Sequence, residues 1–555
     1  MKNCAEQPRC RELLSERKWA FALILLVVLL NPVFYFMADD VTWRDKCYAW
    51  LTCLFTVGAL SGACLLWKAR GTKVYLTVLF LLSLAPNIVV WSYLYLSNIY
   101  MWGDMFWVIF GSYTSEAKEY ISQFIPWELG LAVVVYVGAG LLCILKSRPV
   151  RRIASDKRKP LYAASLLVVA AVAGFQYLSR AVPVIDFYKS YLFFTVENRT
   201  FMQEKEMHRR TDIKVGCSLP DTTNHVFVVL IGESASTCHM SLYGYPRKTT
   251  PRMDARAGEL DVFTDAVTPD THTIGVMKKI LTFANHAHPE YYHSKASIVE
   301  LFDAAGFETY WISNQVFLSK WGGSYGVIAS LSDHVYDLSV ANRPDGVVLP
   351  VFRDVLHDGI AGNKIIFIHL MGNHHSYEAR YPDEFEHFDH RRDGDLPDAG
   401  FRTDKMKSVI DAYDNSILYG DFVYESLLSA LEETDASSCM LFFSDHGEEI
   451  YDTRKSSGHH MSNVYPCQSR VPLVLWRSAR YRQENPHIVI DTALSCSTEN
   501  IIHAVSTLCG LAHADYNPAL SIFSPAYVAP DTRLVGNEDY RNILKKVAHQ
   551  GTAVK

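Results

Sequence analysis

The sequence lacks the excess of positive charge that is typical of nucleic-acid-binding proteins. Its 555 residues contain 53 lysine and arginine residues against 59 aspartate and glutamate residues, which gives a net charge of -6. A protein that neutralises many phosphates along a nucleic acid needs a basic surface, and this balance does not provide one. We therefore expect no nucleic-acid partner.

Cysteine pairs of the C-x-x-C type are also missing, although the chain has 12 cysteines. A zinc site built from thiolates is therefore not expected. The sequence shows no internal repeat and no low-complexity tract. Its second half carries an even number of cysteines, which permits disulfides without assigning the pairs: Cys217, Cys238, Cys439, Cys467, Cys496 and Cys509.

Long apolar runs are crowded into the first third of the chain. Each is close to the roughly 20 residues that a helix needs to cross a bilayer. The first run could be a cleaved signal peptide, but it is long for one and lacks an A-x-A-like exit, so we expect it to be retained. Five membrane-spanning helices are predicted: Trp19–Met37, Cys47–Trp67, Val74–Tyr95, Trp127–Leu145 and Leu161–Leu178.

Basic residues precede the first run and follow the second and fourth runs, and these segments are expected to be cytoplasmic. An odd number of spans then exports the rest of the chain. We predict a transmembrane domain over residues 1–180, a linker over 181–224, a soluble domain over 225–540 and a polar tail over 541–555. The linker is rich in aromatic and charged residues, as a segment on a membrane surface or an ordinary linker would be.

The exported half alternates apolar runs with helical patterns. The runs 225–231, 309–312, 364–368 and 439–443 are continuous, which is typical of strands buried on both faces. Helical patterns over 297–305 and 419–431 lie between them. This alternation predicts an α/β domain with a largely parallel, doubly wound central sheet.

Three short motifs lie where strands of such a sheet would open into loops, which is where α/β folds assemble their sites. They contain Glu233, Thr273 and the pair Asp445-His446. Carboxylates and imidazole are ligands that zinc accepts, and a hydroxyl nucleophile needs activation of the kind a metal supplies. Taken together, the motifs predict a zinc-bound threonine nucleophile.

Taken singly, each motif has an ordinary explanation. Asp-His-Gly after a strand is often a turn, and glutamate after glycine often begins a helix. Four histidines on two further loops could be solvated, or they could hold a second metal or grip a phosphate. These are His374, His375, His459 and His460, among which we favour His374 and His459, with His460 as the alternative to the latter.

A metal of this kind suits group transfer from a phosphodiester, because phosphoryl transfer depends mainly on positioning and charge neutralisation. A serine-hydrolase mechanism would require a nucleophile elbow such as G-x-S-x-G. The three loops that carry the motifs do not contain one.

At these residues the chain resembles the membrane-bound phosphoethanolamine transferases of bacterial envelopes, which belong to the alkaline phosphatase/sulfatase superfamily. The resemblance covers nearly the whole chain, including the five-span anchor. It is carried by several blocks: Gly232–Ser234, Met240–Tyr245, Thr249–Pro251, Leu281–Ala284, Trp311–Gln315, His369–His374, Arg380–Pro382 and Asp445–Asp452.

The resemblance implies a protein of the bacterial inner membrane with its catalytic domain in the periplasm. Thr273 would take phosphoethanolamine from phosphatidylethanolamine, release diacylglycerol and pass the group to lipopolysaccharide through a covalent intermediate. Glu233, Thr273, Asp445 and His446 match the family's zinc ligands, and one zinc ion is expected, with a second left open. The histidines favoured above match the family's second-metal or substrate positions.

The resemblance also bears on lipid and acceptor. Ser112 and Glu116 look like the family's lipid head-group contacts, although a helix solvated at the membrane surface explains them equally well. Members that confer colistin resistance by modifying lipid A have a Cys before the nucleophile, where this chain has Pro269-Asp270-Thr271. The chain is more similar to relatives that modify heptose of the lipopolysaccharide core.

Other functions remain open at this point. Glycerol-phosphate transferases of the lipoteichoic-acid-synthase type join five spans to a similar domain but use phosphatidylglycerol. A periplasmic glucan or a protein could replace lipopolysaccharide as the acceptor. A true sulfatase is disfavoured because the Cys-x-Pro-x-Arg signature is missing, and a transporter or scaffold is disfavoured because intramembrane charges and repeated halves are not evident.

Overall fold

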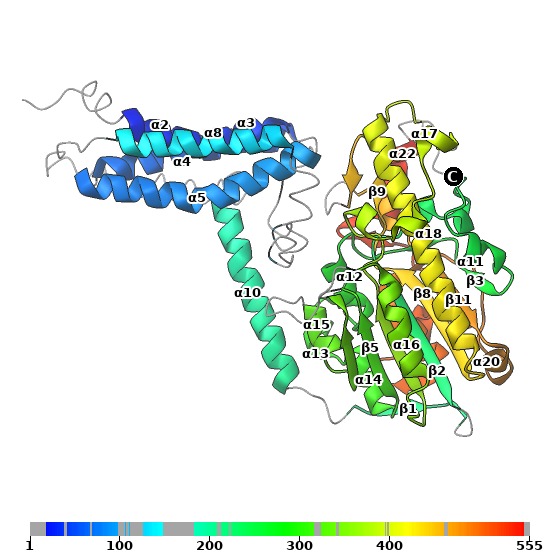
Figure 1. The fold of residues 1–555 in the computed structure, drawn as a ribbon. Helices are drawn as coiled ribbons and strands as arrows, with labels where there is room; N and C mark the ends of the chain where they lie inside the picture. The colour runs from blue at the N-terminus through cyan, green and yellow to red at the C-terminus, as the bar shows by residue number, and fades with distance from the viewer. Residues whose placement is uncertain are drawn as a thin grey trace, which may run out of the picture. The chain divides into compact units, whose positions relative to one another are not determined.

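The computed structural model divides the chain into two compact units, Met1–Val196 and Glu197–Lys555. It describes residues 18–37, 42–66, 69–97, 101, 106, 110, 126–147, 183–207, 213–220, 224–315, 324–339, 343–394, 396, 399–459 and 464–548 (Figure 1). The division falls within a helix inside the predicted linker.

The described part of the first unit is helical. The first predicted span is divided at Leu29 into two helices, because Pro32 cannot donate the backbone hydrogen bond that would continue the helix from Val28. The linker contributes a helix of 25 residues, α10. The helices are α2 (Lys18–Val28), α3 (Leu30–Met37), α4 (Trp43–Leu66), α5 (Ala69–Ser97), α8 (Trp127–Lys146) and α10 (Pro183–Met207).

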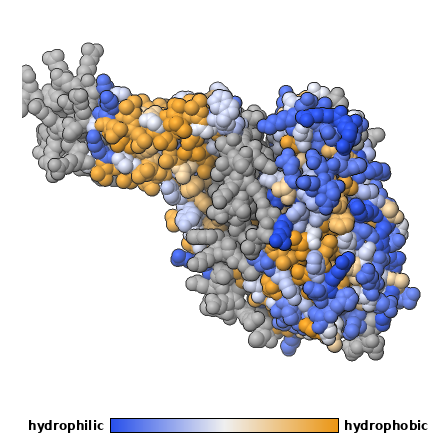
Figure 2. All heavy atoms as spheres, viewed as in Figure 1, coloured by the Kyte–Doolittle hydropathy of each residue, from blue (hydrophilic) through white to orange (hydrophobic). Residues whose placement is uncertain are grey.

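Two helices of the described residues are long and apolar enough to cross a membrane, Gly71–Tyr95 and Trp127–Lys146. Figure 2 shows apolar side chains over much of the visible face of this unit, and among the exposed ones are Val74 and Val134. The predicted span over 161–178 lies outside the described residues. The number of five spans therefore stays a prediction.

Buried polar side chains join the helices of this unit. Asn87 on α5 donates to the carbonyl of Val27 at 3.0 Å and to the hydroxyl of Tyr136 at 3.1 Å. Trp91 donates to the amide oxygen of Asn31 at 3.0 Å. Polar groups away from water need such partners, and these bonds tie α5 to α2, α3 and α8.

The second unit is built on a seven-stranded mixed sheet in the order β3-β11-β8-β2-β7-β5-β6. The five strands from β8 to β6 are mutually parallel, and four of them contain the predicted apolar runs. Strand β11 runs antiparallel to β8 and β3. The strands are β2 (His225–Gly232), β3 (Leu260–Val262), β5 (Glu308–Ser313), β6 (His334–Asp337), β7 (Lys364–His369), β8 (Ser437–Ser444) and β11 (Leu473–Arg477).

Helices cover both faces of the sheet (Figure 1). The strands bury alternate residues against the two layers. Phe227, Val229 and Ile231 of β2 belong to one core, and the intervening residues belong to the other. The first core includes α12 (Thr273–Ile280), α14 (Ile298–Ala304) and α21 (Ile501–Leu508), and the second includes α16 (Val348–Leu356) and α18 (Asp404–Glu432). A fully covered parallel sheet gathers the loops at the carboxyl ends of its strands along one edge.

One disulfide joins two loops near that edge. Cys238, in the short helix η2 (Thr237–His239), is bonded to Cys467, in α19 (Pro466–Ser469). The other four cysteines of the second unit, Cys217, Cys439, Cys496 and Cys509, are free. The bridge spans 229 positions of the sequence, so it restricts the unfolded chain strongly.

Removal of this disulfide is expected to destabilise the second unit. The Cys238→Ser variant should lower the free energy of unfolding by about 2–5 kcal/mol, because the unfolded chain regains the freedom that the bridge removes. The measurement is thermal unfolding of the full-length protein in detergent. Cys217→Ser, at an exposed free cysteine, is the matched control, and equal melting temperatures for both variants would contradict the expectation.

Candidate active site

Four predicted residues meet at the carboxyl edge of the sheet. Glu233 follows β2, Asp445 and His446 follow β8, and Thr273 begins α12. The hydroxyl of Thr273 donates to Oε2 of Glu233 at 3.0 Å. Nε2 of His446 lies 3.4 Å from Oε1 of Glu233 and 3.5 Å from Oδ2 of Asp445. The structure thus brings the proposed nucleophile to the three proposed ligands.

The donor atoms of this group fit a divalent cation. Nδ1 of His446 lies 3.0 Å from the carbonyl oxygen of Gly447. A carbonyl can only accept, so Nδ1 carries a proton, and Nε2 is the atom that can give a lone pair to a metal ion once its own proton has left. Two atoms of the group, Nε2 of His446 and Oδ2 of Asp445, are buried and have no hydrogen-bond partner among the described residues. Such atoms call for a ligand, and carboxylate and imidazole suit zinc.

The electrostatics of the site also favour a cation. Burial raises the pKa of Glu233, and the charge of Asp445 raises it further. Burial alone would lower the pKa of His446, but the carboxylates of Asp445 and Glu233 raise it to about 9. Two buried carboxylates next to each other are costly without positive charge, which either a proton or a metal ion can supply.

Two glycines allow the loops to approach this closely. Gly372 has a φ of +52°, and a Cβ atom there would lie 2.6 Å from the carbonyl oxygen of Glu233. A Cβ atom on Gly447 would overlap the carbonyl oxygen of Cys467. Both positions therefore require glycine, and the second explains why glycine follows Asp445-His446.

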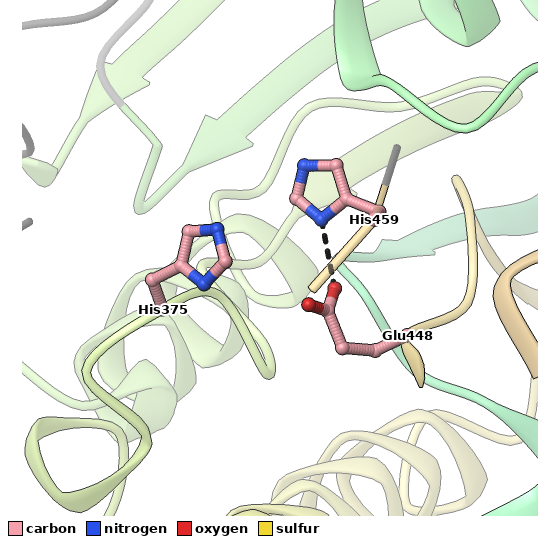
Figure 3. A group of neighbouring side chains, drawn as sticks. All are labelled: His375, Glu448 and His459. Atoms are coloured by element: carbon pink, nitrogen blue, oxygen red, sulfur yellow. Dashed lines mark hydrogen bonds and ion pairs between the residues drawn. The ribbon is translucent and has the colours of Figure 1, made fainter. Parts of the chain in front are cut away.

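A second group of possible ligands lies beside the first. His375, Glu448 and His459 offer atoms that lie within 4.8 Å of one another, and Figure 3 shows their side chains facing a common space. Nδ1 of His459 lies 2.8 Å from Oε2 of Glu448. The rings of His459 and His446 are 4.2 Å apart, so the two groups are adjacent.

The histidines of the second group are neutral, as metal ligands must be. Burial lowers the pKa of His459 to about 3 and that of His375 to about 4. Burial also raises the pKa of Glu448 to about 7. Two neutral imidazoles beside one carboxylate suit a cation. The N–H groups of the same rings could instead donate hydrogen bonds to the phosphate of a substrate.

Of the two histidines favoured from the sequence, one lies in the second group. His459 belongs to the second group, whereas His374 does not, although its ring lies 5.3 Å from that of His375. Burial lowers the pKa of His374 well below its usual value. His460 and the head-group candidates Ser112 and Glu116 lie outside the described residues.

Sequence reasoning missed several residues of the site. Glu448 directly follows the Asp-His-Gly run, and His272 directly precedes Thr273, so adjacency to a motif was the signal for both. The ring of His272 lies 4.9 Å from that of His459. Gln315 ends the Trp311–Gln315 block and donates to Glu233 at 2.8 Å.

A G-x-S-x-G run does occur elsewhere in the chain, at residues 322–326. Its serine, Ser324, begins α15 (Ser324–Ala329). This serine lies outside the three loops that carry Glu233, Thr273 and the Asp445-His446 pair.

Comparison with known proteins agrees with this geometry. A family model named Sulfatase matches residues 225–513. Over 470 residues the chain is 30% identical to phosphoethanolamine transferase EptC of Escherichia coli K12, with 80% of each chain covered. The chain belongs to the phosphoethanolamine transferases of the sulfatase family. The chain is also 30% identical to phosphoethanolamine transferase CptA of Salmonella typhimurium, again with 80% of each chain covered.

Solved structures show the same fold. The periplasmic domain of E. coli EptC in complex with zinc is 31% identical to this transferase, with a TM-score of 0.56, and covers 60% of this chain and 96% of that chain. The integral membrane lipooligosaccharide phosphoethanolamine transferase A of Neisseria meningitidis is 19% identical, with a TM-score of 0.64 over 92% of this chain and 97% of that chain. The latter likeness concerns the fold alone.

Zinc affinity at the first group is expected to depend on pH. With a pKa of about 9, the metal-free His446 binds a proton at neutral pH, and zinc must displace that proton. Apparent affinity should therefore rise about tenfold per pH unit from about pH 6 to about pH 8. Competition with a chromophoric chelator measures it, and an affinity independent of pH over that range would contradict the assignment.

Proposed function

We propose that this chain is a zinc-dependent transferase that moves phosphoethanolamine from phosphatidylethanolamine to lipopolysaccharide through a covalent intermediate on Thr273. The observation that carries the proposal is the hydrogen bond of 3.0 Å between the Thr273 hydroxyl and Glu233, beside Asp445 and His446. The names of the relatives support the transferred group, and the zinc complex of E. coli EptC supports the metal.

Glu233, Asp445 and His446 would hold the ion, with Thr273 at the remaining position. A zinc ion bound there supplies Lewis acidity toward a phosphoryl oxygen and stabilises the threonine alkoxide. Glu233 orients the Thr273 hydroxyl toward the phosphorus atom through its hydrogen bond. The side chains of Glu233, Asp445 and His446 are fully buried, whereas Thr273 is partly exposed, so the hydroxyl can be reached from outside while its partners are shielded from bulk water.

The proposed reaction has two displacements. In the first, Oγ1 of Thr273 forms a bond to phosphorus, the bond from phosphorus to the glyceryl oxygen breaks, and diacylglycerol leaves with a proton. In the second, a hydroxyl of the acceptor forms a bond to phosphorus, loses its proton, and Thr273 leaves as the alcohol. A nucleophile used twice in this way gives ping-pong kinetics.

The proposed location is the bacterial inner membrane, with five spans and the catalytic domain in the periplasm. Two described helices have the required length and apolarity, and the fold likeness to the N. meningitidis integral membrane protein extends over both units. The Cys238–Cys467 disulfide suits an oxidising compartment. The acceptor is proposed to be core heptose, with lipid A as the alternative position on the same molecule.

Replacement of the nucleophile tests the reaction. Thr273→Ala should reduce diacylglycerol release from labelled phosphatidylethanolamine by about 10³-fold or more, because the attacking hydroxyl is gone. Thr273→Ser keeps a hydroxyl and should still form the adduct, which mass spectrometry would locate on the peptide containing residue 273. Normal release by Thr273→Ala would refute the proposal.

The same assay separates the rival donors and acceptors. Purified enzyme offered phosphatidylglycerol should form no adduct; a glycerol-phosphate adduct would instead indicate the lipoteichoic-acid type of donor. Lipopolysaccharides with and without core heptose distinguish the two sites on that acceptor. Transfer only to a glucan or a protein would show that lipopolysaccharide is the wrong acceptor.

We further propose that His375, Glu448 and His459 hold a second zinc ion. The wild-type protein should then bind two equivalents at saturating zinc, and His375→Ala should bind one, because a three-ligand group loses one of its members. His374→Ala is the matched control and should keep both equivalents. If His374→Ala alone removed the second equivalent, the choice of His374 from the sequence would be the correct one.

A further inference from the structure

Ser234 has an unusual backbone conformation between the two carboxylates of the first group. It follows Glu233 directly, is fully buried and has a φ of +57°. Residues other than glycine rarely adopt this left-handed conformation, because Cβ then lies close to the backbone. Such conformations persist where surrounding contacts enforce them, and they cluster at functional sites.

All three polar groups of Ser234 are used, and two of them contact the proposed zinc ligands. Its backbone N–H donates to Oδ1 of Asp445 at 3.1 Å, and its hydroxyl donates to Oε1 of Glu233 at 2.9 Å. Its carbonyl accepts a hydrogen bond of 2.6 Å from the hydroxyl of Tyr413. One residue therefore connects carboxylates that come from two different strands.

These bonds decide which oxygen atoms remain for a cation. Oδ1 of Asp445 accepts from the backbone N–H groups of Ser234 and His446. Oδ2 is left without a hydrogen-bond partner among the described residues and lies 3.5 Å from Nε2 of His446. On the other carboxylate, Oε2 of Glu233 accepts from Thr273 and from Gln315. Oε1 accepts from the hydroxyl of Ser234, and Nε2 of His446 lies 3.4 Å from it.

We propose that Ser234 is a positioning residue for the zinc site, which it orients through its hydroxyl group. This inference rests on the proposed function for the identity of the metal. In the left-handed conformation the N–H donates to Asp445 while the side chain reaches Glu233. The hydroxyl thereby holds the orientation of the Glu233 carboxylate, as groups bound to metal ligands commonly do.

Two substitutions distinguish a role of the Ser234 hydroxyl in zinc binding from a role of Ser234 in the turn alone. Ser234→Gly removes the hydroxyl but favours the left-handed backbone, so relief of backbone strain offsets the cost of the lost hydrogen bond and the melting temperature should change little. Its zinc affinity should nevertheless fall about 10–100-fold, which is the usual effect of losing a partner of a metal ligand. Ser234→Ala also lacks the hydroxyl but keeps Cβ, and should show a similar loss.

The matched control is Asp435→Gly. Asp435 has a φ of +50° and an exposed side chain in the turn before β8, so glycine there makes the same backbone change without touching the zinc site. Its zinc affinity should equal that of the wild type. Affinity is measured on the full-length protein by competition between Zn²⁺ and a chelator, without lipid.

The outcomes are distinct. Unchanged zinc affinity in Ser234→Gly and Ser234→Ala would overturn the proposal, because the residue would then serve only the turn. Weak binding by Ser234→Gly with normal binding by Ser234→Ala would also overturn it, because backbone freedom rather than the hydroxyl would be responsible. Zinc affinity is measured without lipid. Failure of the phosphoethanolamine-transfer assay and failure of this proposal can therefore be told apart.

Discussion

The structure of the catalytic unit depends on the close approach of two buried carboxylates, Glu233 and Asp445. Each follows one of two adjacent parallel strands, β2 and β8, which are paired along their whole length. Their charges would repel each other in a buried environment, so the edge of the sheet is stable only with a cation or with protons. His446 lies beside both carboxylates and can meet either need. It carries a proton in the absence of a metal, because the carboxylates raise its pKa to about 9. It can give the lone pair of Nε2 to a metal ion once that proton has left, because Nδ1 is bonded to the carbonyl oxygen of Gly447.

The residues that the sequence could predict are those whose position follows from a strand end. Glu233, Asp445 and His446 come directly after apolar runs, and parallel strands bring such ends together. The choice between His374 and His375 could not be made in this way, because adjacent loop residues point in different directions according to local turns. The turn here includes Ser376 with a φ of +67°, which no pattern in the sequence indicates.

In the fold, too, some features could be predicted from the sequence and others could not. Continuous apolar runs identify the parallel strands, because burial on both faces removes polar residues from them. The pairing of Cys238 with Cys467 could not be predicted, since six cysteines allow many pairings and only the folded loops select one. Division of the first apolar run at Leu29 was predictable in principle from Pro32, but a hydrophobicity pattern alone does not register a missing backbone donor.

The disulfide has a consequence for biogenesis. Its two cysteines are separated by 229 positions, and the intervening chain supplies the threonine at residue 273, five of the seven strands of the central sheet and the Asp445-His446 pair. The covalent link can therefore close only after the chain has been synthesised as far as Cys467, which lies beyond most of this unit. Closure of the loop beside the proposed zinc ligands is then a late event in folding, and it requires an oxidant for the two thiols.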